Sequence, residues 1–116
     1  MLPTDICKND DGGSTAIQAK KDGVSLSNNY DEGTDFGGCR EIDHKSENVQ
    51  KIIKAYLKFL KEDIGYTGFR YDMVKGFSGT HVADYNDATG VEFSVGEYWD
   101  GNQSIINWIN KTNKKS

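Results

Sequence analysis

The sequence has few of the residues that bind transition metals or cross-link a small fold. It contains two cysteines, Cys7 and Cys39, two histidines and one proline among 116 residues. No group of cysteines and histidines has the spacing of a zinc site, which excludes a zinc finger or a related module. The two cysteines bracket a glycine-rich region, so they could form a disulfide in a secreted protein or remain free thiols in a reducing compartment.

Basic charge and long apolar runs are also scarce. The chain has 14 Lys and Arg residues against 18 Asp and Glu residues, a formal net charge of −4. Nucleic-acid binding needs a basic patch, so we expect no nucleic acid as a partner. No apolar run is long enough to span a bilayer, so we expect no membrane partner. The N-terminus carries no signal segment, which was either removed or never existed at this boundary.

Residues 1–44 are typical of an irregular lobe, because turn-forming Gly, Asn and Asp residues interrupt every apolar stretch. We expect at most brief strands there. A loop-rich segment of this length needs a function or an external support to be ordered. Oxygen ligands on a bendable backbone suit calcium, although the same residues could form a solvated acidic loop. The clustered acidic residues are Asp31, Asp35, Glu41 and Asp43.

Residues 46–63 are the clearest helix in the sequence. Their apolar residues recur at the i, i+3, i+4 and i+7 spacing of an amphipathic helix, and lysines occupy the other faces. Ser46 is a suitable N-cap, and Gly65 stands just beyond the expected end. We expect the apolar stripe to face the core and to have no ligand role.

Strands and helices are predicted to alternate after this first helix. Strands are expected over residues 66–72 and 91–98, and helices over residues 78–87 and 105–109. This order favours parallel strands joined by right-handed crossovers. Two parallel strands are not self-sufficient, and a barrel of eight such units needs about 250 residues. The predicted fold class is therefore α/β, a partial (β/α)8 TIM-barrel segment over residues 45–116 preceded by the irregular lobe.

Each predicted strand carries a carboxylate near its end. Arg70 and Asp72 alternate with two aromatic residues, which places the charged pair on one face of the first strand. Glu97 lies near the end of the second strand. Two carboxylates at neighbouring strand ends are an arrangement that barrel enzymes use for catalysis. The alternative is that Arg70 and Asp72 form a structural ion pair.

Several of these segments resemble the α-amylase family of glycoside hydrolases, family 13. Residues 68–76 resemble its fourth-strand motif, and residues 94–100 resemble its fifth-strand motif. Residues 35–38 and 41–44 resemble the calcium-binding end of the family's domain B. The resemblance covers residues 5–113 and is closest to the plant and bacterial liquefying-type branch. The order and spacing of the three motifs make it specific.

The resemblance implies a role for each matched residue of the two strands. Asp72 corresponds to the catalytic nucleophile, and Glu97 to the general acid/base. Arg70 corresponds to the arginine that keeps the nucleophile ionised and oriented. The residues that would contact the sugar or line its cleft are Lys75, Tyr98 and Trp99.

The resemblance also implies calcium as a cofactor. Asp35 corresponds to a carboxylate ligand, and Gly76 to a position that offers its backbone carbonyl. Glu41 stands where the family usually has aspartate. The complete set of candidate metal-site residues is Asp31, Asp35, Cys39, Glu41 and Gly76. Such an ion would tie the polar lobe to the strand that carries Asp72.

The spacing of neighbouring strands agrees with these roles. Retaining glycosidases need two carboxyl groups about 5 to 5.5 Å apart, and neighbouring strands lie about 4.8 Å apart. The apolar and aromatic residues around Glu97 are expected to raise its pKa, as a proton donor requires.

The implied function is that of an endo-acting, retaining α-amylase that hydrolyses α-1,4 bonds in starch-type glucans or maltooligosaccharides. The family's third-strand His motif and seventh-strand Asp motif are missing from the 116 residues. We therefore expect a central fragment that needs the remainder of the barrel as its partner, in a secreted protein. The alternatives are a non-catalytic calcium- or glucan-binding fragment and a sister α-glucosidase.

Overall fold

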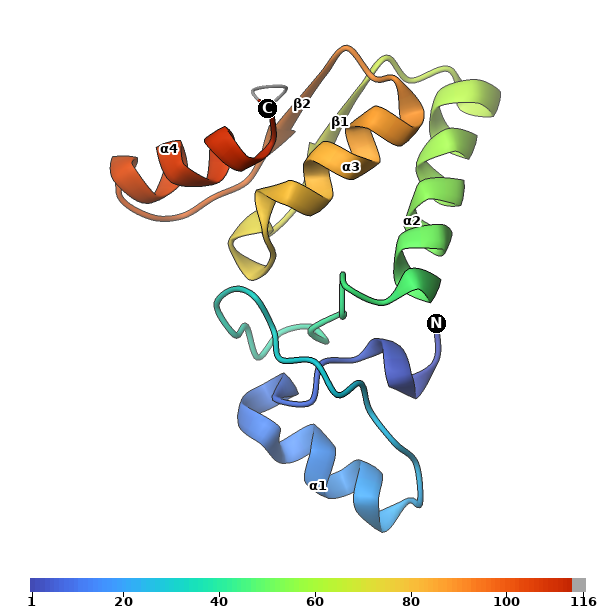
Figure 1. The fold of residues 1–116 in the computed structure, drawn as a ribbon, viewed down its shortest axis with the longest axis vertical. Coiled ribbons are helices and arrows are strands. Elements are labelled where there is room, and N and C mark those ends of the chain that lie inside the picture. The colour runs from blue at the N-terminus through green and yellow to red at the C-terminus, as the bar shows by residue number, and fades with distance from the viewer. Residues whose placement is uncertain (114–116) are drawn as a thin grey trace.

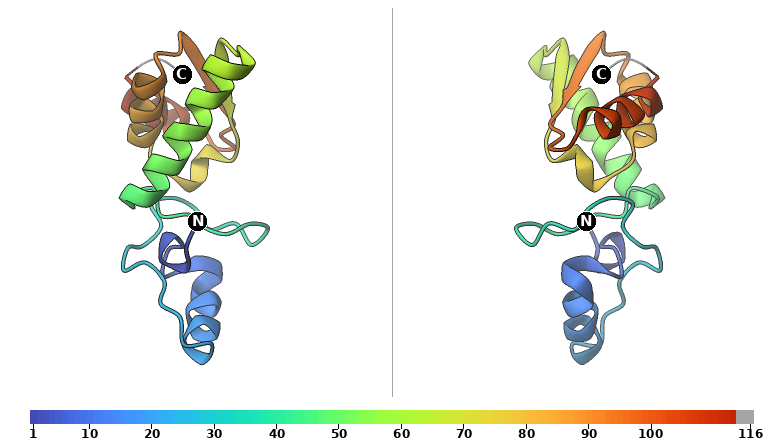
Figure 2. Two further views of the ribbon diagram at one scale, coloured as in Figure 1. Left: turned by 90° about the vertical axis from the view of Figure 1, so that its right-hand side faces the viewer. Right: turned by 90° about the vertical axis from the view of Figure 1, so that its left-hand side faces the viewer.

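The computed structural model describes residues 1–113, which form an elongated molecule of 45 × 36 × 20 Å. Its helices are α1 (Ser14–Lys21), α2 (Glu47–Phe59), α3 (Gly79–Thr89) and α4 (Asn102–Lys111), and its strands are β1 (Gly68–Tyr71) and β2 (Phe93–Gly96). Helices α2 to α4 gather around the two strands at one end, and α1 lies at the other end (Figures 1 and 2). The chain is thus a small mixed helix and strand structure.

The two strands form one parallel sheet, as the alternation of strands and helices predicted. Gly68 pairs with Phe93 and the register continues to Tyr71 opposite Gly96. Each strand is shorter than expected, because the chain turns away directly after the paired residues. A two-stranded sheet has open edges on both sides. The described residues contain no closed barrel.

Helix α2 begins where the sequence predicts, but its α-helical part ends at Phe59 instead of residue 63. The Ser46 hydroxyl accepts a hydrogen bond from the Val49 amide, and a π-helical turn, Leu60–Ile64, leads to Gly65. Gly65 has a φ of 95°, which favours glycine. The helix buries Val49 and Leu57, but Tyr56 of the predicted apolar stripe is exposed.

Two small hydrophobic clusters hold the sheet and its helices together. The first joins α2, the amino-terminal end of the parallel strands and α3, and consists of Leu57, Phe69, Tyr85 and Val91. The second joins the turn after β1 to α3 and α4, and consists of Val74, Val82 and Trp108. Trp108 is 7% exposed and anchors α4 in this second cluster.

The prediction of at most brief strands in residues 1–44 is wrong, because this segment contains α1. The helix buries only Ala19, and Ile17 is 63% exposed. Its apolar pattern is therefore too weak for sequence periodicity to reveal it. Gly13, at a φ of 92°, precedes the helix, and Gly23, at a φ of 70°, follows it. A single antiparallel bridge joins Ile6 to Ile42.

Buried aspartates organise much of this lobe. Asp5 accepts hydrogen bonds from the Leu2 amide and from the side chains of Ser46 and Asn48, which links the N-terminus to the start of α2. Asp10 accepts from the side chains of Thr15 and Arg40 and from the Glu41 amide. Asp43 accepts from Ser27, Asn29 and the Lys45 amide.

The cysteines are not bonded to each other. Cys7 is buried and Cys39 is exposed, and both carry free thiols. Across residues 1–113, none of the helices combines the length and apolarity that a bilayer crossing requires.

Candidate active site

The parallel register brings Asp72 and Glu97 to the same edge of the sheet. Tyr71 and Gly96 are the last paired residues, and the two carboxylates follow them directly. The Glu97 amide donates a hydrogen bond to the Tyr71 carbonyl (2.9 Å), and the Val74 amide donates to the Glu97 carbonyl (3.1 Å). Backbone hydrogen bonds therefore fix the two strand ends beside each other.

Arg70 bridges both carboxylates. Its Nη1 lies 2.7 Å from Asp72 Oδ1, and its Nη2 lies 3.3 Å from Glu97 Oε1. The side chain of Asp72 is 68% exposed and that of Glu97 is 26% exposed. The site is thus an open, charged pair of carboxylates with a shared guanidinium.

The expectation of a raised pKa for Glu97 is wrong in this structure. A hydrogen bond from the Trp99 side chain, then contacts with Asp72 and the Met73 amide, lower its pKa, and the charge of Arg70 adds to the effect. The apolar neighbours do not enclose Glu97, so burial contributes little. Glu97 is therefore held as a carboxylate here.

The residues proposed to bind sugar lie around this pair. The ammonium of Lys75 contacts Asp100 Oδ2 (3.0 Å) and the Trp99 carbonyl (3.4 Å). Trp99 is 74% exposed and offers a free ring face. Tyr98 packs against Trp108, with ring centroids 6.0 Å apart, so its ring serves the core. The role of Asp100 was missed in the sequence, where only its place beside Trp99 could have indicated it.

A cavity of about 340 Å³ adjoins Asp72. It lies between the polar loop of the lobe and the turn after β1. Asp72, Met73 and Lys75 line it from the turn, and Asp35, Phe36 and Glu41 line it from the loop. The arrangement gives Asp72 one concave side, which a ligand could enter.

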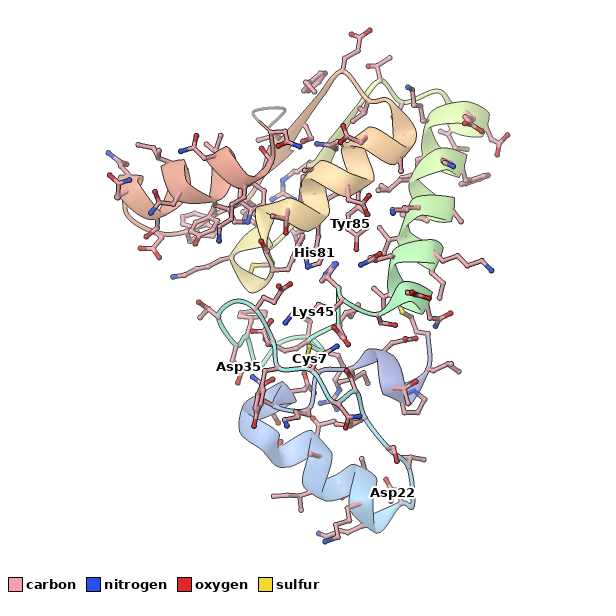
Figure 3. The ribbon with its side chains drawn as sticks, in the orientation of Figure 1. Cys7, Asp22, Asp35, Lys45, His81 and Tyr85 are labelled. Carbon is pink, nitrogen blue, oxygen red and sulfur yellow. The ribbon has the colours of Figure 1, made fainter. Side chains whose placement is uncertain are left out.

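The candidate metal-site residues lie on this loop and on the turn that faces it. The Thr34 amide donates to the Lys75 carbonyl (3.2 Å), so the loop touches the backbone next to Gly76. Asp35 accepts a hydrogen bond from the Gly12 amide. In residues 1–113, no three His, Cys, Asp or Glu side chains are grouped closely enough to hold a metal ion. Figure 3 shows Asp35 and Cys7 in this part of the lobe.

One oxygen of the half-buried Glu41 side chain lacks a hydrogen bond. Its Oε1 accepts from the Phe36 amide, whereas Oε2 is buried and has no hydrogen-bond partner among the donors of the described chain. Burial raises the pKa of Glu41 to about 8, and contact with Asp31 and the charge of Asp35 contribute. A buried carboxylate oxygen without a hydrogen-bond donor, next to other acids, is stabilised when a cation binds it.

A second polar cluster joins the lobe to α3. His44 stacks on Phe77 with ring centroids 4.2 Å apart, and its Nδ1 lies 2.8 Å from the Tyr85 hydroxyl. His81 pairs with Glu32. His81, Tyr85 and Lys45 lie along this junction in Figure 3. Neither histidine was among the candidate site residues of the sequence.

Comparison with curated proteins finds α-amylases and related glucan hydrolases. The chain is 39% identical over 99 residues to Alpha-amylase 3, chloroplastic, of Arabidopsis thaliana. The match covers 72% of this chain and 11% of that protein. It is 33% identical over 103 residues to Probable alpha-amylase 2 of the same plant, covering 76% of this chain and 25% of that protein. A Glucan 1,4-alpha-maltotetraohydrolase of Stutzerimonas stutzeri is 30% identical over 83 residues.

No protein-family model matches the chain. The chain spans between a tenth and a quarter of the length of the two plant relatives. The matches nevertheless cover most of the chain, and all three proteins bear names of α-glucan hydrolases. The resemblance seen in the strand motifs is therefore confirmed, and the chain belongs to the α-amylase family of glycoside hydrolases.

Proposed function

We propose that these residues form the central part of the catalytic site of a retaining, endo-acting α-1,4-glucan hydrolase. The observation that carries the proposal is the parallel register, which brings Asp72 and Glu97 to one edge of the sheet with Arg70 between them. Starch-type glucans and maltooligosaccharides are the proposed substrates. The relatives named as α-amylases support this choice.

The proposed chemistry needs two carboxyl groups with different roles. Asp72 attacks the anomeric carbon and forms a glycosyl ester while protonated Glu97 gives its proton to the departing glycosidic oxygen. Glu97, now ionised, takes a proton from water, and the resulting hydroxide displaces Asp72 from the sugar. Arg70 keeps Asp72 ionised for the first step.

Glu97 must gain a proton before it can act as the donor in the first step, because its pKa is lowered in this structure. A glucan that enters would cover Glu97. Removal of water from Glu97 raises its pKa, which would give it the proton that the first step consumes.

We propose calcium as the cofactor of the polar loop. The buried, unpaired oxygen of Glu41 supports the fit, with Asp31 and Asp35 nearby and backbone carbonyls of the 74–76 turn as further oxygen donors. Cys39 does not fit, because calcium takes oxygen ligands and this thiol is exposed. When bound, the ion would neutralise these acids and tie the loop to the turn after β1.

We propose that residues 1–44 form the domain B lobe and residues 45–116 a barrel segment, which pairs with the remainder of a barrel in the full-length protein. The exposed apolar side chains of β2, Phe93 and Val95, support a missing neighbour there. Secretion stays our proposal for the compartment, although one relative is named as chloroplastic.

A second candidate function is binding of glucan without hydrolysis. The open sheet edges and the absence of the family's His and second Asp motifs favour it for the 116-residue chain by itself. The two functions differ in what the carboxylates do. Binding needs them only as hydrogen-bond acceptors, whereas hydrolysis needs one to attack and the other to carry a proton.

Starch hydrolysis by Asp72→Asn and Glu97→Gln variants of the full-length protein tests the proposal. We expect each variant to lose at least about 10³-fold in kcat with an unchanged melting temperature, because each removes a reacting group but no buried contact. Glu92→Gln is the matched control, since this exposed carboxylate lies at the opposite end of β2 and should leave kcat unchanged. Near-full activity in either site variant would overturn the assignment.

The same assay on the 116-residue chain separates the two candidate functions. Hydrolysis that Glu97→Gln abolishes would mean that the chain assembles a working site. Retention of maltoheptaose without hydrolysis, measured by calorimetry, would support the binding function for the chain alone.

A further inference from the structure

The loop of the lobe contacts the backbone of Lys75 and holds this residue at the cavity. It lies in the short turn Val74–Gly76, directly after the strand end that carries Asp72. Its carbonyl accepts the Thr34 amide, and Gly33 approaches so closely that an added Cβ would lie 2.2 Å from this carbonyl oxygen. Any residue other than glycine at position 33 would displace the turn. The main chain of Lys75 is therefore fixed by the loop of the lobe.

The side chain of Lys75 is held from the other side by the segment after β2. Its ammonium lies 3.0 Å from Asp100 Oδ2 and donates to the Trp99 carbonyl at 3.4 Å. The other oxygen of Asp100, Oδ1, accepts the Gly101 amide at 2.7 Å. Gly101 is the N-cap of α4, so the backbone at the start of this helix orients the carboxylate. Asp100 is thus oriented independently of Lys75.

We propose that Asp100 is a positioning residue, which holds the side chain of Lys75, a residue that lines the cavity, and thereby strengthens glucan binding. The proposal rests on the function proposed above. A lysine has a flexible four-carbon stem, and a substrate that binds it must first immobilise that stem. Asp100 and the Trp99 carbonyl immobilise it in advance. Lys75 keeps a free donor for a sugar hydroxyl, because the ammonium has three protons and these contacts use two.

An exposed ion pair without a function is the alternative reading of the same contact. Such pairs usually contribute little to stability, and Lys54 with Asp84, between α2 and α3, is an example. The two ion pairs differ in where they lie relative to the cavity. Lys75 lines the cavity that also contains Asp72, whereas Lys54 and Asp84 are remote from it. A purely structural pair would change stability alone, and a positioning pair would change substrate affinity.

Steady-state kinetics of Asp100→Asn on maltoheptaose, in the full-length protein, tests the proposal. Asparagine keeps an oxygen for the Gly101 amide and removes the charge that holds Lys75. We expect KM to rise about two- to fivefold with kcat within a factor of two, because the lost preorganisation affects binding. In a Lys75→Met background the same change should not raise KM further.

Asp84→Asn is the matched control and should leave KM unchanged. A wild-type KM in Asp100→Asn, or an equal rise of KM in the Lys75→Met background, would overturn the positioning role. A lower KM would also overturn it, because Asp100 would then sequester the lysine. Absence of glucan hydrolysis by the wild-type protein would instead refute the proposed function, and the positioning role with it.

Discussion

At the residue scale, ionised carboxylates hold the polar lobe together. Burial by itself would raise the pKa of Asp5, Asp10 and Asp43, but hydrogen bonds to each carboxylate outweigh it, so the pKa of each is lowered. Their contribution to stability is complete above the ordinary value of 3.8 and is lost as the pH falls below it. A lobe with little apolar core thus gains its order from hydrogen bonds to charge.

Glu41 is the exception among these carboxylates and gives a test of calcium binding. Its pKa of about 8 lies above the ordinary 4.5, so its protonated form stabilises the fold at low pH and this contribution is lost as the pH rises through 8. At pH 8.5 without calcium, we expect Glu41→Gln to raise the melting temperature by about 3 °C. Calcium should raise the melting temperature of the wild-type protein and not that of the variant.

Glu62→Gln is the control for Glu41, because this glutamate is exposed in the turn after α2. Differential scanning fluorimetry with and without calcium measures all three proteins. If calcium stabilised Glu41→Gln as much as the wild type, Glu41 would not be a ligand.

At the element scale, α2 is the helix whose packing determines the stability of the sheet region. Leu57 is only 7% exposed and packs in the cluster with Phe69, Tyr85 and Val91. We expect Leu57→Ala to lower the free energy of unfolding by about 2–4 kcal/mol, through lost burial and the cavity left behind. Urea denaturation followed by circular dichroism measures this change.

Lys58→Ala, one residue further along α2, is the matched control. Lys58 is exposed, and alanine is a good helix former, so the change should stay within about 0.5 kcal/mol. Similar losses in both variants would mean that α2 is not anchored through Leu57.

Part of the apolar stripe of α2 and of the turn that follows it remains exposed. Tyr56 and Ile64 are more than half exposed, although their spacing marks them as core residues. The whole apolar stripe of α2 would be buried only if both edges of the sheet were covered. In this structure β1 pairs with a strand on one side alone. The stripe supports our proposal that further strands pack against this helix.

At the scale of the whole molecule, a histidine joins the lobe to the sheet region. His44 stacks on Phe77 and contacts the Tyr85 hydroxyl, and Lys45 and His81 both contact Glu32. Burial, followed by the charge of His81, lowers the pKa of His44 from 6.5 to about 4. The fold therefore keeps His44 neutral where an unfolded chain would bind a proton.

This neutral histidine makes stability depend on pH. Its contribution is complete above pH 6.5 and falls as the pH is lowered towards 4, by about 3 kcal/mol at most. We expect the midpoint of urea denaturation to fall over this range in the wild-type protein. In His44→Asn, whose amide can still meet Tyr85, the fall should be clearly smaller. An equal fall in the variant would assign the pH dependence to other groups.

The sequence by itself determined the chemistry-bearing residues and the order of the elements. Ser46 and Gly65 bound α2, because capping and left-handed turns depend on local residue types. The alternation of strands and helices predicted the parallel pair, and the motifs around Asp72 and Glu97 indicated the family that the curated relatives confirm. All of these features follow from residues close together in the chain.

Only the tertiary structure decided the environment of each group. It brought Arg70 to both carboxylates, left Glu97 open so that its pKa falls, and placed Asp100 on Lys75. It also buried Glu41 without a full set of partners. Burial and charge contacts join residues that are distant in the chain, so they depend on packing that residue spacing does not specify.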